Sequence, residues 1–188
     1  MKSFFGLAVL ALGIAIGTSS VSAQMANTGN PMVGGAAMYK TKNIVENAVN
    51  SADHTTLVAA VKAAGLVDTL SSAGPFTVFA PVNSAFAALP AGTVETLLKP
   101  ENKGTLSKVL TYHVVAGNID SKAVLAAIKK GKGKAELTTV AGGKITASLD
   151  GKNVIITDEK GRKSTVTIAD VKQSNGVIHV VDSVLLPN

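Results

Sequence analysis

The side chains best suited to chemistry in this 188-residue sequence are its three histidines, His54, His113 and His179. The chain has no cysteine, which excludes a thiol nucleophile and disulfides. A hydrolase would combine a histidine with Asp182 and a serine such as Ser84 or Ser183, but no G-x-S-x-G pattern occurs. A metal site would need further ligands, and no carboxylates stand at ligand spacing around these histidines. The sequence therefore favours a protein that is not an enzyme and carries no metal or other cofactor.

His179 lies within the apolar stretch SNGVIHVVDSVLLPN that ends the sequence. On a strand it would share a face with two valines. An imidazole buried there without partners would cost about 1–3 kcal/mol. We therefore expect His113 and His179 to be neutral, at least partly buried, and hydrogen-bonded to the backbone or to neighbours such as Tyr112 or Asn83.

Helical patterns dominate the first half of the chain and must position these residues. The segment HTTLVAAVKAAG predicts a helix that Asp53 caps and that ends at Gly65. The stretch FTVFAP predicts a strand, after which Asn83 is placed to cap a short helix ended by Pro90. Two more helices are predicted, through residues 101–114 and from Ser121 to Lys130.

After Lys134 the hydrophobic period changes from about 3.6 residues to about 2. Five strands separated by turn residues are predicted, in the segments AELTTV, KITASLD, NVIITD, STVTIADV and GVIHVVDSVLL. Helices followed by a meander of strands indicate an α+β domain.

The N-terminus has the pattern of a secretory signal peptide. Lys2 precedes an apolar run and a small-residue cleavage site ending at Ala23. We expect a signal peptide over residues 1–23, a flexible Gly-rich leader over 24–40 and one domain over 41–188. No later apolar run is long enough to span a bilayer, so we expect no transmembrane segment in the mature chain and a secreted, extracellular or periplasmic location.

The chain is basic, with a formal net charge of +6, but Arg162 is its only arginine. Lysine does not make the planar bidentate contacts by which arginine recognises nucleic acids, so no nucleic-acid partner is expected. The segment KKGKGK concentrates four lysines in six residues: Lys129, Lys130, Lys132 and Lys134. It is either a solvated loop or a binding patch for an anionic partner.

Three stretches resemble the fasciclin domain family. TVFAPVNSAFAALP at 77–90 and NGVIHVVDSVLLP at 175–187 are similar to the two sequence blocks of that family, and YHVVAG at 112–117 to the Tyr-His pair between them. The resemblance covers about residues 41–188. It implies a single α+β domain with helices mainly in the N-terminal half and a twisted, antiparallel-rich β-wedge in the C-terminal half.

The resemblance also implies a role outside the cell, most often in adhesion or matrix contact, with no catalytic centre established for the family. The Tyr-His pair, proposed there as an adhesion determinant, corresponds to Tyr112 and His113. Asn83 stands where an acidic or amide residue is usual, and the Arg-Gly-Asp tripeptide is absent, so integrin binding does not carry over.

Two functions stay open at this point. The first is an exported, non-enzymatic contact module for a cell-surface or matrix protein, a glycan or an anionic envelope component, in an oligomeric state that the sequence leaves undetermined. The second is a carrier of an apolar small molecule such as a carotenoid, because some fasciclin-type proteins bind pigments. Such a ligand needs an extended apolar groove.

Overall fold

The computed structural model describes residues 29–188, so the predicted signal peptide and the first residues of the predicted leader lie outside the described residues. The predicted α+β architecture is confirmed. A seven-stranded sheet has the strand order β4-β3-β9-β8-β7-β6-β5. Its strands are β3 (Phe76–Pro81), β4 (Val114–Ala116), β5 (Lys134–Thr138), β6 (Lys144–Asp150), β7 (Asn153–Thr157), β8 (Lys163–Gln173) and β9 (Gly176–Val181).

The sheet is mostly antiparallel and strongly twisted. The strands from β5 to β9 form an antiparallel meander, whereas β3 pairs parallel with β9 and antiparallel with β4. A single bridge between Val115 and Thr139 joins the two ends of the sheet. The two edge strands, β4 and β5, therefore lie close to each other.

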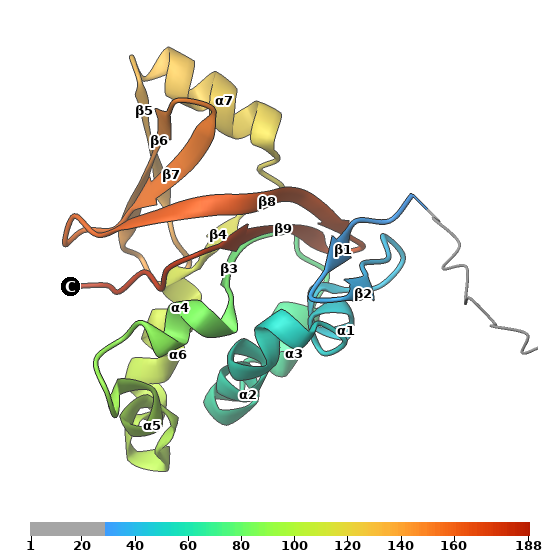
Figure 1. The fold of residues 1–188 in the computed structure, drawn as a ribbon, viewed down its shortest axis with the longest axis vertical. Coiled ribbons are helices and arrows are strands. Elements are labelled where there is room, and N and C mark those ends of the chain that lie inside the picture. Colours follow the sequence, from blue (N-terminus) through green and yellow to red (C-terminus); the bar gives the residue numbers. More distant parts are fainter. Residues whose placement is uncertain (1–28) are drawn as a thin grey trace, which may run out of the picture.

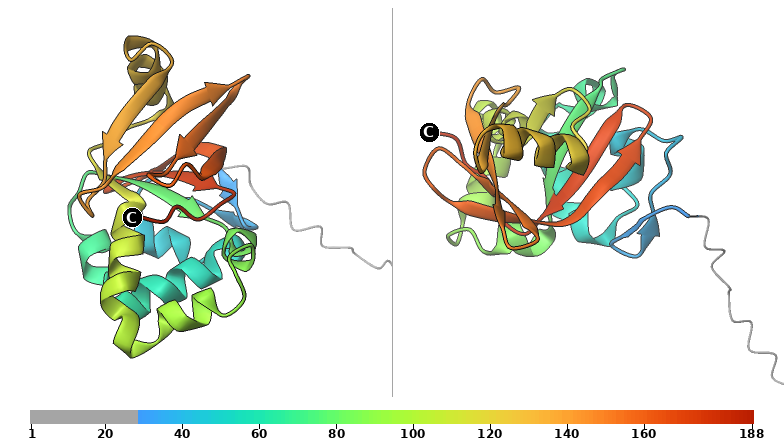
Figure 2. Two further views of the ribbon diagram at one scale, coloured as in Figure 1. Left: turned by 90° about the vertical axis from the view of Figure 1, so that its left-hand side faces the viewer. Right: turned by 90° about the horizontal axis from the view of Figure 1, so that it is seen from above.

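The helices occupy two separate places (Figures 1 and 2). Six helices gather at one end of the molecule, and α7 (Ser121–Lys130) lies at the other end beside β5 and β6. The six are α1 (Ile44–Ala48), α2 (Thr55–Ala64), α3 (Val67–Ser71), α4 (Asn83–Ala87), α5 (Thr93–Leu98) and α6 (Lys103–Tyr112). Two single 3-10 turns, Ala52–His54 and Pro100–Asn102, connect them.

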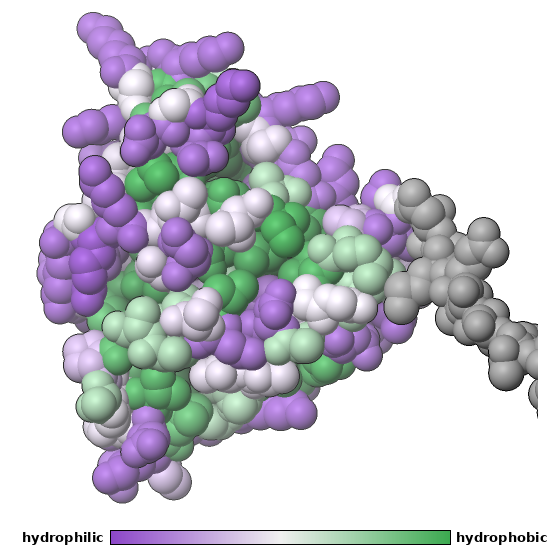
Figure 3. Space-filling model, viewed as in Figure 1, coloured by the Kyte–Doolittle hydropathy of each residue, from purple (hydrophilic) through white to green (hydrophobic). Residues whose placement is uncertain are grey.

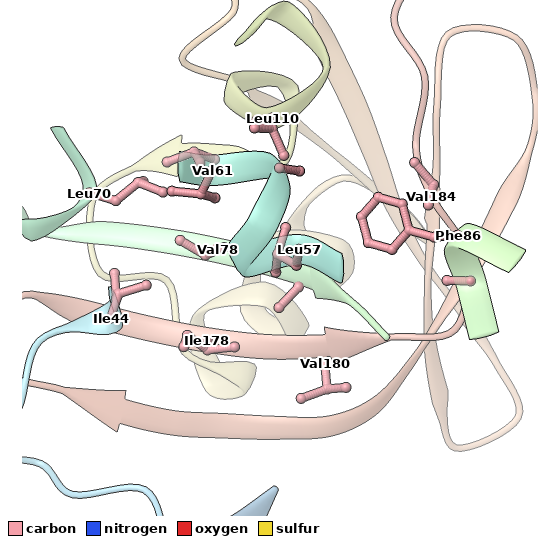
Figure 4. Close-up of a cluster of buried hydrophobic side chains, with 14 of the residues drawn as sticks. Ile44, Leu57, Val61, Leu70, Val78, Phe86, Leu110, Ile178, Val180 and Val184 are labelled. Atoms are coloured by element: carbon pink, nitrogen blue, oxygen red, sulfur yellow. The ribbon is translucent and has the colours of Figure 1, made fainter. Parts of the chain in front are cut away.

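Two hydrophobic cores follow from this arrangement. The larger lies between the six helices and strands β3, β8 and β9, with Leu57, Val78 and Ile178 among its buried side chains (Figure 4). The smaller is enclosed by the sheet and α7, and includes Phe79, Ile128 and Ile156. Strands β3 and β9 contribute side chains to both cores, which explains why their sequences are almost continuously apolar.

The sequence pattern located most of the elements. Helix α7 and strand β6 have the predicted bounds, and Gly65 ends α2 in the left-handed conformation, at φ 71°. Two capping predictions differ from the structure. Asp53 lies in a 3-10 turn and makes no cap hydrogen bond to α2, and Asn83 does not cap α4.

The predicted flexible leader differs from the structure in its described part. Strands β1 (Met32–Val33) and β2 (Ala36–Ala37) form a small hairpin, and Val33 and Met38 are buried against the larger core. At Gly34 the backbone approaches the chain at 51–53 so closely that a β-carbon would collide with Ser51 Oγ. The glycine that reads as flexibility in the sequence is therefore a site of tight packing.

Candidate functional site

The Tyr-His pair lies inside the molecule. Tyr112 is fully buried; its hydroxyl donates to the Lys144 carbonyl at 2.7 Å and accepts from the Glu159 amide at 3.2 Å. Burial, together with the nearby carboxylates of Glu159 and Asp158, raises the pKa of this phenol. The pair therefore joins α6 to the strands. Both side chains are buried, so neither is exposed to contact another molecule.

His113 ends α6 and contacts the last residues of the chain. Its Nδ1 lies 2.8 Å from the Val109 carbonyl, and its Nε2 accepts from the Leu185 amide at 2.9 Å. The neutral imidazole with its proton on Nδ1 satisfies both contacts. Burial lowers the pKa of His113 to about 4, so the ring is neutral at pH 7.

His179 is buried on β9. Its Nε2 lies 2.9 Å from the Ile119 carbonyl, Nδ1 accepts from the Asp170 amide at 3.4 Å, and the ring stacks on Phe79. Both ring nitrogens are occupied by backbone groups, so no nitrogen is left for a substrate or a metal. The ring fastens β9 to β8 and to the segment before α7.

Asn83 caps a helix, but not the one predicted. Its Oδ1 accepts from the Thr56 amide at 3.0 Å and the Thr55 hydroxyl at 3.2 Å, and its Nδ2 donates to the Ala52 carbonyl at 2.8 Å. These partners form the start of α2. Asn83 therefore ties α2 to the end of β3, and the four motif residues Asn83, Tyr112, His113 and His179 occupy separate structural positions instead of one surface site.

The four lysines of KKGKGK lie together at the far end of the molecule. Lys129 and Lys130 form the last turn of α7, and Lys134 begins β5, and all four are exposed. The helix C-terminus favours positive charge. Neither ion pair in the described part of the chain, Glu136 with Lys144 or Asp158 with Arg162, involves them.

The turn between α7 and β5 is closely built. The Gly133 amide donates to the Ile128 carbonyl at 2.8 Å, and Lys132 and Gly133 have positive φ. A β-carbon at Gly131 would collide with the Lys134 carbonyl, so only glycine fits there. Figure 3 shows hydrophilic residues gathered at this end of the molecule. We call Lys129, Lys130, Lys132 and Lys134 the lysine patch.

Sequence reasoning missed the site around His54. An apolar cavity of about 50 Å³ lies in the larger core, under the β1–β2 hairpin and among α1, α2, α3, β3 and β9. His54 lines it and is 3% exposed, and its Nδ1 is 2.9 Å from Ser51 Oγ. Burial lowers its pKa. The only sequence signal for this site was a histidine directly before an apolar helix. The residues near His54 in the sequence do not indicate a cavity, because distant segments form it.

Arg162 was singled out in the sequence only by its rarity. Its Nε donates to Asp158 at 2.9 Å, and the same carboxylate accepts from the amides of Lys160, Arg162 and Leu186. Burial alone would raise the pKa of Asp158, but the hydrogen bonds from Leu186 and Arg162 outweigh it and lower the pKa. The single arginine thus holds the C-terminal segment in place.

The family model for the fasciclin domain matches residues 52–187. The chain belongs to the fasciclin domain family. It is 51% identical to protein sll1483 of Synechocystis sp. over 178 residues, covering 93% of this chain and 91% of that protein. It is 30% identical to the immunogenic protein MPB70 of Mycobacterium bovis, covering 98% and 94% of the two chains.

A solved structure agrees in fold. The chain superimposes on a FAS1 domain pair from the insect cell adhesion molecule fasciclin I with a TM-score of 0.69 at 18% identity, covering 77% of this chain and 51% of that one. The hairpin and α1 precede the residues that the family model matches. None of the helices within residues 29–188 is long and apolar enough to cross a membrane.

Proposed function

We propose that this fasciclin-domain protein is an exported, non-enzymatic contact module that binds an anionic glycan or envelope component through the lysine patch. The observation that carries the proposal is the contrast between the two candidate sites. The histidines and the tyrosine of the fasciclin motifs are buried and occupied by backbone partners, whereas the four lysines are exposed and clustered.

The chemistry of the patch supports recognition by charge. A lysine side chain is a flexible point charge that binds anions without a fixed contact geometry. A cluster of lysines therefore suits a surface of repeated negative charges better than a single ligand of defined shape. Arg162, which could recognise a phosphate group by a planar contact, is paired with Asp158. The proposal therefore includes no nucleic-acid partner.

The test compares two charge-matched variants on an immobilised carboxylated polysaccharide. In the first, Lys129, Lys130, Lys132 and Lys134 are changed to Gln; in the control, the exposed Lys40, Lys99, Lys160 and Lys163 are changed to Gln. Both lose four positive charges. We expect only the first variant to lose retention. Equal loss of retention in both variants would mean that binding depends on net charge alone, which would contradict the proposed role of the lysine patch.

Carriage of a carotenoid is less well supported by the geometry. The cavity of about 50 Å³ is far below the several hundred Å³ of pockets that enclose drug-sized ligands, and a carotenoid is larger still. If protein purified from its native source contained a stoichiometric visible chromophore, carriage of an apolar molecule would be the better supported function.

A further inference from the structure

An exposed leucine lies at the same end of the molecule as the lysine patch. Leu149 is 42% exposed, although on β6 it points to the same face as Ala147, which is fully buried in the smaller core. The strand register accounts for this difference. Strand β5 begins at Lys134, opposite Ser148, so no residue of β5 lies opposite Leu149. Its paired neighbour on the other side is the half-buried Val154 of β7.

The turn between β6 and β7 adds a fifth lysine to this end of the molecule. It runs from Asp150 to Asn153, which pair with each other, and it carries the exposed Lys152. The register places this turn beyond the start of β5, and Figure 1 shows β5, β6 and β7 reaching the same end as α7. The carboxylate of Asp150 offsets only one of the five lysine charges. Leu149 is therefore an apolar side chain in a region of net positive charge.

This combination suits the surface of a lipid bilayer. Lysines near a bilayer are attracted to anionic headgroups, and an exposed apolar side chain is stabilised at the boundary between headgroups and acyl chains. The aliphatic stems of the lysines can lie along that boundary while their ammonium groups stay in water. A hydrated polysaccharide attracts the same lysines but offers Leu149 no apolar interior.

We propose that the anionic envelope component bound by the lysine patch is a phospholipid surface, and that Leu149 inserts at its headgroup boundary. The inference rests on the proposed contact function and names the partner of that function. Charge brings the lysine patch to the surface, and Leu149 adds an apolar contact that only a bilayer provides.

The first experiment is co-sedimentation of the exported form of the protein with vesicles. We expect binding to vesicles of phosphatidylglycerol and phosphatidylcholine, and none to phosphatidylcholine alone. Changing the four lysines of the patch to Gln should weaken binding at least about a hundredfold, because each lysine near an anionic surface contributes on the order of fivefold.

Two matched variants test the apolar contact. Leu149→Ser should bind these vesicles about three- to tenfold more weakly, because it removes the apolar area that would enter the bilayer. Val140→Ser removes a similarly exposed apolar side chain beyond the other end of β5 and should bind like the wild type. Both variants keep the lysine patch, so both should elute from the carboxylated polysaccharide at the same salt concentration as the wild type.

Insertion at position 149 has a readout of its own, because the chain contains no tryptophan. The fluorescence of Leu149→Trp should move to shorter wavelength on the anionic vesicles. Lipids brominated on their acyl chains should quench it. Val140→Trp, bound to the same vesicles, should show neither change.

Two results would overturn the lipid proposal and leave the contact function in place. One is unchanged Leu149→Trp emission on vesicles that bind the protein, which would mean contact by charge alone. The other is retention on the polysaccharide without binding to the anionic vesicles at the same salt concentration, which would make a glycan the partner. The contact function itself fails if the variant lacking the four lysines co-elutes with the wild type from the polysaccharide, so the two failures are distinguishable.

Discussion

At the scale of single residues, the groups that could have done chemistry instead hold the fold together. His113 joins the end of α6 to the C-terminal segment through two backbone contacts, and His179 joins β9 to its neighbours in the same way. A buried polar group whose partners are all present stabilises one packing arrangement, because every alternative leaves it unpaired. This explains why histidines occur within otherwise apolar segments.

The low pKa of His113 predicts a pH dependence of stability. The folded pKa is about 4 and the unfolded value about 6.5, so between these pH values the unfolded chain binds a proton that the folded chain does not. The free energy of unfolding should therefore fall as the pH falls through this window, by about 3 kcal/mol from this residue.

Urea unfolding at pH 7.5 and pH 4.5 checks this expectation, with His113→Gln as the comparison. The glutamine amide offers a donor and an acceptor but does not titrate. The variant should be less stable than the wild type at pH 7.5, and the difference should shrink at pH 4.5. A constant difference across the two pH values would show that His113 does not titrate in this way.

At the scale of elements, the sequence predicted what depends on local pattern and missed what depends on distant partners. The alternating pattern placed β6, and the periodicity of SKAVLAAIKK placed α7. Asn83 was recognised as a capping residue, but its helix begins 28 positions earlier in the chain. No pattern around residue 83 identifies that partner.

The hairpin and the cavity were missed for a similar reason. The segment QMANTGNPMVGGAAMY has no period, and its Val33 and Met38 are buried only because the later helices α1 and α2 pack near them in the larger core. Features made by tertiary contact leave no mark in a local pattern.

Loss of the Asn83 cap should destabilise the domain. Asn83→Ala leaves the Thr56 amide and the Ala52 carbonyl without their partner, so we expect a loss of about 1–2 kcal/mol in the free energy of unfolding. Asn83→Asp keeps the acceptor and should lose less. Ser84→Ala, at the exposed neighbouring position of the same helix, is the control, and an Asn83→Ala as stable as this control would contradict the cap.

At the scale of the whole molecule, the protein has two ends with different properties. The helical end carries the larger core and the cavity, and the end formed by α7, β5 and β6 carries the lysine patch. The fold was predictable from its motifs, because the fasciclin blocks include β3 and β9, which pair with each other and contribute side chains to both cores. For the proposed contact surface, the sequence predicted only a cluster of four lysines and left open whether they form a binding patch or a solvated loop.

Export of the molecule is a separate prediction. The small residues ending at Ala23 should be cut, so intact mass and N-terminal sequencing of the exported form should give Gln24 as the first residue, in open or cyclised form. A protein that keeps residues 1–23 would contradict the proposed secreted location.

We infer that the lysine patch is the contact surface and that the buried motif residues are not. The most direct measurement is the salt concentration at which the protein elutes from a carboxylated polysaccharide, for the wild type and for the variant with Lys129, Lys130, Lys132 and Lys134 changed to Gln. Exposed charges are screened within about 8 Å at physiological salt, so the wild type should be released as salt rises. The variant should elute at the lowest salt, with a thermal unfolding midpoint lowered only slightly by the loss of the favourable charges at the end of α7. Co-elution of the two proteins would show that the lysine patch is not the contact surface.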